Sequence, residues 1–282
     1  MSRFNLVRLG AVLGLVGSTL FGSSLLKTGM AAFALPDAQV VQKLQSVPVF
    51  AIADAQGAPL VAAPGQGEKG SSVAGVFISQ KDAQSFLDGL KTRNPELAKS
   101  VRVVPVSLGE VYQLERAGQN RPEKLEFAFV PVQQQVDLAV NLLRQSGQKV
   151  EQFNGVPLFI ARGGQDNGYL TIQQGNQQVI PLFFEKEQLQ ALLENFKKQQ
   201  PSLASTVNIQ VVNLEGVIQT LQTSNKPELN QIVLIPSRES INFMQSLQQA
   251  PAGQNQPGVR PPAGQNQPGA RPPAGQNRPA GR

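Results

Sequence analysis

The sequence predicts an α+β fold made of two tandem homologous α/β repeats, with mixed sheets covered by amphipathic helices. Three observations support this prediction. Residues 76–114 are matched by residues 182–220 at an offset of 106 positions, the same order of apolar segments continues on both sides of that match, and strand-period and helix-period segments alternate in each copy. Each copy is about 100 residues long, an ordinary domain size. Duplicated units of this kind often pack about a pseudo-two-fold axis, and the seam between them is a usual place for a groove.

The internal match depends on apolar residues and prolines at equivalent positions. The matched pairs are Phe77 with Phe183, Phe86 with Leu192, Leu87 with Leu193, Leu90 with Phe196, Pro95 with Pro201, Leu97 with Leu203, Val101 with Val207 and Leu108 with Leu214. Such residues are typical of cores and of helix ends. The match therefore indicates a repeated fold and singles out no catalytic residue.

Five short strands are expected in each copy, because apolar segments are bounded by Gly, Pro, Asn or Asp. They lie at 49–53, 60–62, 73–78, 101–106 and 125–130 in the first copy, and at 158–161, 169–173, 178–184, 207–212 and 232–235 in the second. The first two strands of each copy are joined by a turn from Asp54 to Gly57 or from Asp166 to Gly168. An Asp-to-Gly turn between apolar segments predicts a hairpin.

Helices are expected after the third, fourth and fifth strands. Ser79 and Asp82 form a capping box before the first helix, and Pro95 ends it. A helical turn should follow the fourth strand, capped by Ser107 in one copy and by Asn213 in the other. The last helix of each copy should face inward through its apolar residues. These are Val136, Ala139, Val140 and Leu143 in the first copy, and Ile241, Met244 and Leu247 in the second.

The charge of the chain lies at its two ends. The formal charge is +6, from 25 Lys and Arg against 19 Asp and Glu. Residues 1–34 carry three cations and residues 251–282 carry four, with no acid in either segment, which leaves 18 cations and 19 acids in residues 35–250. A nucleic-acid-binding domain usually carries a basic stripe on its folded part. We therefore expect no nucleic-acid partner.

Residues 1–34 are expected to be a cleavable signal peptide. Two arginines precede an apolar segment from Leu9 to Leu26, and Ala32 to Ala34 has the small-residue pattern of a cleavage site after Ala34. The alternative is an uncleaved membrane anchor, since the apolar segment just reaches the length that a span needs. After cleavage the chain would be exported without an integral membrane span, and the periplasm is its expected location.

The exported chain is expected to have four parts. A short helix at 35–46 precedes the first repeat at 47–150 and the second repeat at 151–250, and a disordered tail occupies 251–282. The tail repeats an eleven-residue unit rich in Pro, Gly, Gln, Asn and Arg, and it has no aromatic residue from which to build a core. We expect a spacer. The alternative is a weak contact of its arginines with an anionic wall or membrane surface.

Catalysis is restricted by the residue types that the chain lacks. It contains no His, no Cys and no Trp, so imidazole and thiolate chemistry, disulfides, and imidazole or thiolate metal ligands are excluded. Asp54 and Asp166 occupy equivalent positions and are the candidates for the two carboxylates of a hydrolase. Asp beside Gly is, however, usual in turns. We therefore expect no catalytic residue, no cofactor, no metal site and no enzymatic activity.

Four phenylalanines are the candidate hydrophobic client-binding surface. Phe183 and Phe184 point to opposite faces of their strand, because successive side chains alternate. Either both faces are covered, or one of the two rings lines an apolar surface meant for a partner. Phe127 and Phe129 share one face of another strand. The alternative for all four rings is that they belong to the core.

Four features carry a resemblance to a known family. They are the paired strands that begin with Val-Pro at Val47 and Val156, the segment VFISQKDAQSFL from Val76 with its later echo, the helix start FAFVPVQQ from Phe127, and the signal peptide. In these features the chain resembles the family of the twenty-two-kilodalton component of the translocon at the chloroplast inner envelope, in its cyanobacterial form. The resemblance covers roughly residues 36–250 and omits the tail.

The resemblance implies a protein of the periplasm or the thylakoid lumen, pseudo-two-fold in shape, with non-polar pockets on its surface. It implies a chaperone-like escort, or holdase, that binds apolar segments of unfolded precursors or outer-membrane proteins. Its partners would be these clients and the outer-membrane assembly and translocation machinery. Two alternatives stay open, a structural adaptor of an envelope translocation or assembly complex and the carboxylate-based periplasmic hydrolase.

Overall fold

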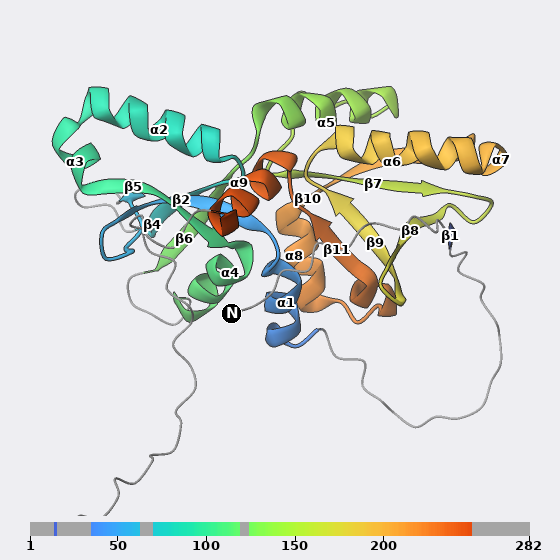
Figure 1. Ribbon diagram of the computed structural model, residues 1–282, viewed down its shortest axis with the longest axis horizontal. Coiled ribbons are helices and arrows are strands. Elements are labelled where there is room, and N and C mark those ends of the chain that lie inside the picture. Colours follow the sequence, from blue (N-terminus) through green and yellow to red (C-terminus); the bar gives the residue numbers. More distant parts are fainter. Residues whose placement is uncertain (1–13, 16–34, 63–69, 119–123, 250–282) are drawn as a thin grey trace, which may run out of the picture.

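The computed structural model describes residues 14–15, 35–62, 70–118 and 124–249. Two sheets extend to either side of a central group of helices (Figure 1). The predicted cleavage site after Ala34, the predicted tail at 251–282, and all of the predicted signal peptide except Gly14–Leu15 lie outside the described residues.

The first sheet is mixed and is built from strands β2 to β6. These are β2 (Pro48–Asp54), β3 (Val61–Ala62), β4 (Ser72–Phe77), β5 (Val101–Ser107) and β6 (Leu125–Val130). Strand β2 lies between β5 and β4 and is antiparallel to both, while β4 also pairs with β6 in parallel and with β3. The register places Phe50 opposite Phe77.

The second sheet has the same strand order, built from β7 to β11. These are β7 (Pro157–Gly163), β8 (Gly168–Gln174), β9 (Gln177–Phe183), β10 (Asn208–Asn213) and β11 (Ile232–Ile235). Strand β7 is antiparallel to both β10 and β9, β11 pairs with β9 in parallel, and Phe159 lies opposite Phe183. The two-residue strand β1 (Gly14–Leu15) pairs with β8. The mixed fold class is confirmed, whereas the pseudo-two-fold axis and the repeat boundaries stay predictions.

Helices connect the strands in the same order in both halves of the fold, β2 to α5 and β7 to α9. The first half contains α2 (Gln80–Arg93), α3 (Pro95–Ser100), α4 (Leu108–Gly118) and α5 (Gln133–Gln145), and the second contains α6 (Lys186–Gln199), α7 (Pro201–Ala204), α8 (Leu214–Thr223), the 3-10 helix η1 (Pro227–Gln231) and α9 (Arg238–Gln249). Helix α1 (Asp37–Leu44) precedes both halves. No helix in the described ranges has the length and apolarity needed to cross a membrane.

Local capping explains where several helices begin. The Ser79 hydroxyl accepts a hydrogen bond from the Asp82 backbone N–H at 3.2 Å, at the start of α2. Ser107 and Glu110 cap α4 reciprocally. The Ser107 N–H donates to the Glu110 carboxylate at 2.7 Å, and the Glu110 N–H donates to the Ser107 hydroxyl at 3.0 Å. Asn213 caps α8 by accepting a hydrogen bond at 2.9 Å from a backbone N–H three residues later.

The helices after the fourth strand of each half are longer than predicted. The helical turn expected in the first half is the eleven-residue helix α4, and its counterpart is the ten-residue helix α8. Both continue because apolar side chains along them are buried, Val111 and Tyr112 in α4 and Leu221 in α8. Tertiary packing of an apolar face stabilises a helix more than local propensity does, and the sequence pattern alone does not show that packing.

A single apolar core joins the two halves. It combines one face of each sheet with side chains of α1, α4 and α8. Its buried members include Val40, Leu44, Val49, Val76, Leu108, Leu158, Leu214 and Leu221. Equivalent backbone bonds anchor α4 and α8 to it, because the Leu108 N–H donates to the Val47 carbonyl and the Leu214 N–H donates to the Val156 carbonyl, both at 2.8 Å.

Helix α1 packs closely against α4. A side chain at Gly109 would place its Cβ 2.9 Å from the Val41 carbonyl oxygen, so glycine is required for this approach. Tyr112 Oη donates to Asp37 Oδ1 at 2.7 Å, and an Arg116 nitrogen lies 3.2 Å from Asp37 Oδ2. The hydrogen bond from Tyr112, followed by that from Arg116, lowers the pKa of Asp37. These contacts fix α1 between the two halves.

The outer face of each sheet has a core of its own. Side chains alternate along a strand, so Val49 faces the central core while Phe50 faces the outer one, and Leu158 and Phe159 divide in the same way. The outer core of the first sheet contains Phe50, Ile52, Phe77, Ala83, Leu87, Leu90 and Ala98, and that of the second contains Ala139, Phe159, Ala161, Leu170, Ile172, Val179, Phe183, Leu189 and Phe196. Each sheet is therefore covered on both faces.

Removal of the Leu44 side chain should destabilise the whole fold, because it opens a cavity in the shared core. Leu44→Ala is expected to lower the free energy of unfolding by about 2–5 kcal/mol. Leu114→Ala is the matched control, since Leu114 is 56% exposed, and it should change that free energy by less than about 0.5 kcal/mol. Urea denaturation followed by circular dichroism measures both. Equal effects of the two variants would contradict the central position of α1.

Candidate functional site

The two candidate phenylalanines of the β9 segment lie in the interior. Phe183 is 6% exposed and belongs to the outer core of the second sheet, and Phe184 is 3% exposed and belongs to the central core. They point to opposite faces, but both faces are covered. The expectation that one of these rings lines an exposed surface is therefore wrong. Helices α5 and α6 cover one face, and the central core with α1, α4 and α8 covers the other.

The other two candidates lie on β6. Phe127 and Phe129 are partly buried and pack against the central core. The strongly exposed large apolar side chains of the described ranges lie instead on six different elements, as Val61, Phe86, Leu114, Tyr169, Leu203 and Val212. The four predicted rings thus form no single surface. A contribution of Phe127 and Phe129 to client binding stays a proposal.

The two equivalent aspartates do not form a catalytic pair. Asp54 Oδ1 accepts hydrogen bonds from the Gln56 and Ala58 backbone N–H groups, both at 2.9 Å, and so closes its turn. Asp166 is exposed in the turn between β7 and β8. The two carboxylates belong to sheets that extend to opposite sides of the centre (Figure 1). Nowhere in the described ranges are three or more acidic side chains grouped so that they could hold a metal ion.

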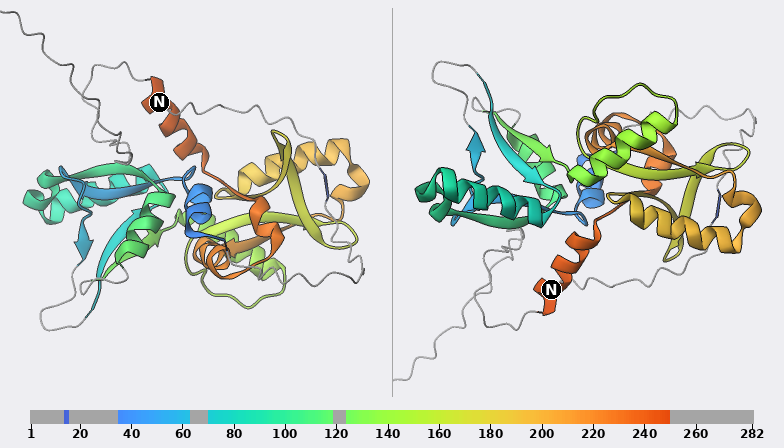
Figure 2. Two further views of the ribbon diagram at one scale, coloured as in Figure 1. Left: turned by 90° about the horizontal axis from the view of Figure 1, so that it is seen from below. Right: turned by 90° about the horizontal axis from the view of Figure 1, so that it is seen from above.

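The last helix of each half packs on the sheet of the other half. In Figure 1, α5 of the first half runs beside α6 above the second sheet, and α9 of the second half lies in front of β2 of the first sheet. Figure 2 shows α9 projecting outward from the centre of the molecule. Ala139 of α5 is fully buried in the outer core of the second sheet, and Phe243 of α9 packs against the outer core of the first. We call α5 and α9 the swapped helices.

Helix α5 is anchored to α6 at its start. The Gln135 side chain is 5% exposed. Its Oε1 accepts a hydrogen bond from the Lys186 backbone N–H at 3.0 Å, and its Nε2 donates to the Glu187 carboxylate at 2.9 Å, so that it caps the first turn of α6. At the other end of α5, Arg144 donates to the Val150 carbonyl oxygen at 2.9 Å.

Helix α9 is anchored through its first two turns. The Glu239 carboxylate accepts a hydrogen bond from the Lys81 backbone N–H at 2.9 Å, so α9 caps α2 much as α5 caps α6. The buried Ser240 hydroxyl donates to the Ile78 carbonyl oxygen at 3.5 Å. Among the described side chains of α9, none after Phe243 makes a hydrogen bond to another element. The apolar side chains of the second half of this helix, Met244 and Leu247, are partly buried.

The aromatic contact of α9 is with the first sheet. The Phe243 and Phe50 rings meet edge to face, with 5.2 Å between their centroids and 70° between their planes. Phe50 itself is fully buried. We define the α9 seat as the three residues of the first half that α9 contacts in these ways, Phe50, Ile78 and Lys81.

The apolar stripe of α9 is wider than its contact with the seat. Ile241, Met244 and Leu247, which are expected to face inward, are only partly buried and belong to none of the three cores. A shallow polar depression of about 320 Å³ lies beside the start of α9 and is lined by side chains of α2 and by Glu239. A partly exposed apolar stripe on a loosely packed helix is the candidate functional site.

Acidic side chains gather where α9 begins. Burial raises the pKa of Asp82 in α2, and the neighbouring carboxylate of Glu239 raises it further. Burial is also the main cause that raises the pKa of Glu185, which accepts a hydrogen bond from the Arg238 backbone N–H that opposes this rise. Glu187 and Glu239 add to the rise at Glu185. The folded protein therefore holds protons on Asp82 and Glu185 more tightly than the unfolded chain does.

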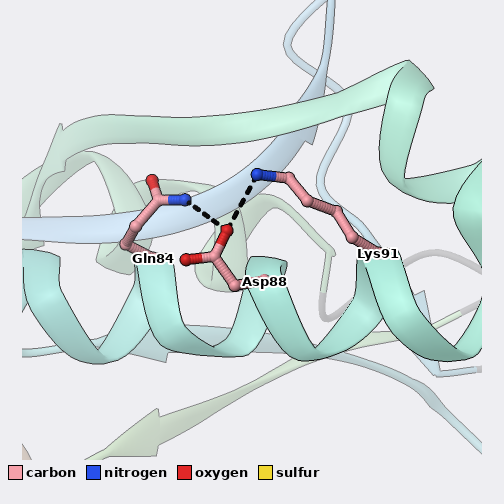
Figure 3. Close-up of polar contacts among 3 residues, drawn as sticks. All are labelled: Gln84, Asp88 and Lys91. Carbon is pink, nitrogen blue, oxygen red and sulfur yellow. Dashed lines mark hydrogen bonds and ion pairs between the residues drawn. The ribbon is translucent and has the colours of Figure 1, made fainter.

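The part of α2 around Asp88 is polar. Asp88 Oδ1 accepts hydrogen bonds from Gln84 Nε2 at 3.1 Å and from Lys91 Nζ at 2.8 Å (Figure 3). The three residues are neighbours on one helix face because they are four and three positions apart. The hydrogen bond from Lys91, and then that from Gln84, lowers the pKa of Asp88.

A cavity of about 510 Å³ lies between α1 and the hairpin of β8 and β9. Half of its lining side chains are amides, and Lys43 is its one cation. Lys43 Nζ donates to the backbone carbonyl oxygens of Asn230 at 2.8 Å and Ile232 at 3.1 Å, and burial lowers the pKa of Lys43. Because lysine at a sheet edge blocks further strand pairing, we interpret Lys43 as protection of the β11 edge.

The sequence pattern did not predict that α5 and α9 pack on the sheet of the other half, or that Phe243 contacts Phe50. The apolar period of α9 identified its inward residues but not the sheet on which they pack. One signal was present in the sequence. Ser237 and Ser240 are polar residues at the start of this helix, and both are buried, with 3.0 Å between their hydroxyl oxygens. Serines at such positions indicate specific polar contacts with another element.

Comparisons with known proteins match this chain to proteins that carry the name Tic22 or TIC 22. The model of the Tic22-like family matches residues 2–246. Protein TIC 22-like, chloroplastic, of Arabidopsis thaliana is 27% identical over 201 residues, which are 70% of this chain but only 60% of that protein. Protein TIC 22, chloroplastic, of Pisum sativum is 25% identical over 223 residues, which are 79% of this chain and 81% of that protein.

A solved structure of the same kind shares the fold. Anabaena Tic22 (protein transport) matches with a TM-score of 0.66 and 39% sequence identity, and the match covers 75% of this chain and 97% of that one. The match thus extends over nearly the whole of the solved chain.

Loss of the Gln135 amide should weaken the packing of α5 on the second sheet. Gln135→Ala removes a buried cap and leaves the Lys186 N–H without that acceptor, so we expect the free energy of unfolding to fall by about 1–3 kcal/mol. The neighbouring Gln134 is exposed and also donates to Glu187. Gln134→Ala is therefore the control, with an expected change below about 0.5 kcal/mol. Urea denaturation compares the two, and equal losses would contradict the capping role.

Neutralising Asp82 should stabilise the fold near neutral pH. A raised pKa means that the ionised carboxylate is disfavoured in the folded state, and this penalty disappears as the pH falls through the folded pKa toward the ordinary value. Asp82→Asn should therefore raise Tm by about 1–2 °C at pH 7. The advantage should vanish near pH 4. Thermal denaturation at several pH values provides the measurement.

Asp88→Asn, on the same helix, is the control, and its change in Tm at pH 7 should have the opposite sign. The pKa of Asp88 is lowered, so its ionised form stabilises the folded state above the ordinary pKa, and this contribution is lost in acid. The substitution should lower Tm at pH 7 and have no effect in acid. Shifts of the same sign for both variants at pH 7 would contradict the charge arrangement at the start of α9.

Proposed function

Because the chain belongs to the Tic22-like family, whose model matches residues 2–246, we propose that it is a chaperone-like escort of the periplasm. It binds apolar segments of unfolded precursors or outer-membrane proteins. It then brings these clients to the translocation and assembly machinery of the outer membrane. Members of this family are components of protein transport.

The observation that carries this proposal is the match to Anabaena Tic22, which is described as a protein of protein transport. At 39% identity over 97% of that chain, the same fold is available here for the same general task. The proposal is narrower than the match in two respects. It names the periplasm as the location and unfolded polypeptides as the clients.

The apolar stripe of α9 supports the binding of unfolded chains. Partly exposed apolar side chains are surfaces on which other apolar segments bury area, at about 25 cal/mol per Å² before the cost of ordering is subtracted. Residues 35–250 carry 18 cations and 19 acids, so the folded part has no strong charge of either sign. Such a surface favours clients by their apolar area and not by their charge.

A test of the proposal is the suppression of client aggregation. An outer-membrane β-barrel protein unfolded in urea aggregates when it is diluted into buffer, and the light that it scatters measures this. We expect scattering to fall as the chain is added, without nucleotide. A structural adaptor, which binds a folded partner, would leave the scattering unchanged. That outcome would contradict the proposal and favour the adaptor.

The hydrolase alternative is tested with the double variant Asp54→Asn and Asp166→Asn. The Asp54 carboxylate closes a turn through an oxygen that Asn also provides, so the variant should fold and suppress aggregation like the parent. A hydrolytic activity in the parent that this variant lacks would contradict the assignment of both residues to turns.

A further inference from the structure

We propose that α9 occupies a client-binding site, and that an apolar segment of an unfolded polypeptide binds the α9 seat by displacing this helix. The inference rests on the proposed function and adds to it a site, a mode of binding and a regulatory element. The seat is Phe50, Ile78 and Lys81 of the first half, and α9 comes to it from the second half. The client would therefore take the place of a helix that the chain itself supplies.

The first argument is the unequal anchoring of the swapped helices. Helix α5 places Ala139 in the outer core of the second sheet with Leu138 and Leu142 packed against it, and the buried Gln135 ties its start to α6. Helix α9 is tied to the first half at its start through Glu239 and Ser240, and among its described side chains Phe243 is the one that packs against an outer core. Helix α9 contributes no described side chain to the central core, so it can leave its seat without breaking that core.

The second argument is the looseness of the contact. Ile241, Met244 and Leu247 are only partly buried and belong to none of the three cores. Contacts that bury little apolar area have low local stability, and elements that move on ligand binding come from such regions. The edge-to-face contact between Phe243 and Phe50 is therefore the contact on which the seating of α9 depends.

The third argument is the surface beneath α9. Phe50 lies opposite Phe77 in the sheet, and the Phe77 ring lies 5.5 Å from the Phe86 ring, which is 40% exposed. Displacement of α9 would uncover Phe50 next to this pair and produce a continuous aromatic row that begins at a residue already in solvent. Aromatic side chains contribute large apolar area to an interface.

Helix α9 also indicates the chemistry of the occupant. Its sequence, RESINFMQSLQQ, has one cation and one acid, an apolar stripe, and one aromatic ring that meets Phe50. A client segment that replaces it would be amphipathic, nearly uncharged, and would place an aromatic residue where Phe243 lies. Recognition of an amphipathic segment in an apolar groove of this kind is a common mode of binding.

A helix that competes with the client lowers the apparent affinity for that client. The apparent dissociation constant equals the intrinsic one divided by the fraction of molecules with an empty seat. Phe243→Ala removes the ring that holds α9 without changing the seat. It should therefore strengthen client binding by about tenfold, since it raises the empty fraction by a similar factor. A substitution that improves binding by removing apolar surface is a result that a purely structural role of α9 would not give.

The experiment measures amide hydrogen–deuterium exchange in the full chain, with and without a urea-unfolded outer-membrane β-barrel protein as the probe. We expect the client to accelerate exchange in residues 238–249 of α9 and to leave exchange in residues 133–145 of α5 unchanged. Unchanged or slower exchange in α9 with bound client would overturn the proposal while leaving the holdase function in place.

The variants are compared in the same binding assay. Phe243→Ala should bind the probe more tightly than the parent, and Asn242→Ala, at an exposed position of α9, should bind like the parent. Leu44→Ala is the control for general destabilisation, since Leu44 lies in the central core and not at the seat. Equal gains for Leu44→Ala and Phe243→Ala would assign the effect to partial unfolding and overturn the proposal.

A labelled peptide of residues 238–249 tests the seat without any client. It should bind the full-length Phe243→Ala chain, and the same peptide carrying Phe243→Ala should not. Absence of peptide binding overturns the displaceable seat, and absence of client binding to both parent and variant overturns the holdase function. Dimerisation of the Phe243→Ala chain through exchange of α9 would identify a second copy as the occupant and would overturn the proposal for clients.

Discussion

The central strands β2 and β7 present apolar side chains on both faces, and the rest of the structure follows from the need to cover both. Val49 and Phe50 are successive residues with buried side chains on opposite faces of β2, and Leu158 and Phe159 repeat this in β7. A sheet of this kind cannot leave one face in water. One face of each sheet therefore enters a shared core with α1, α4 and α8, and the other is covered by the helices above it.

The shared core and the swapped helices together make the two halves one folding unit. Leu44 of α1 contacts a core to which both halves contribute, and each half completes the outer core of the other with its last helix. The reciprocal caps are the polar counterpart of this packing, since Gln135 caps α6 and Glu239 caps α2. Neither half has all of its own covering helices, so we do not expect either to be stable alone.

The same arrangement connects stability with function. All four phenylalanines considered at the outset pack in or against a core, and the partly exposed apolar stripe lies on α9. Its start is surrounded by Asp82, Glu185 and Glu239, whose carboxylates meet the positive ends of helices but are partly buried beside one another. A helix held by hydrogen bonds at its start and by an aromatic contact further along is suited to move.

The sequence by itself determined the order of the strands and helices, most of their boundaries, and the caps at Ser79, Ser107 and Asn213, because these depend on periodicity and on contacts within a few residues. It also determined the absence of imidazole and thiolate chemistry, and the family. Only the tertiary structure decided that Phe183 and Phe184 are both interior, that α4 and α8 are full helices, and that α5 and α9 pack on opposite sheets. Periodicity identifies which side chains seek burial, but it cannot identify the surface that buries them, since two similar sheets offer two similar apolar faces.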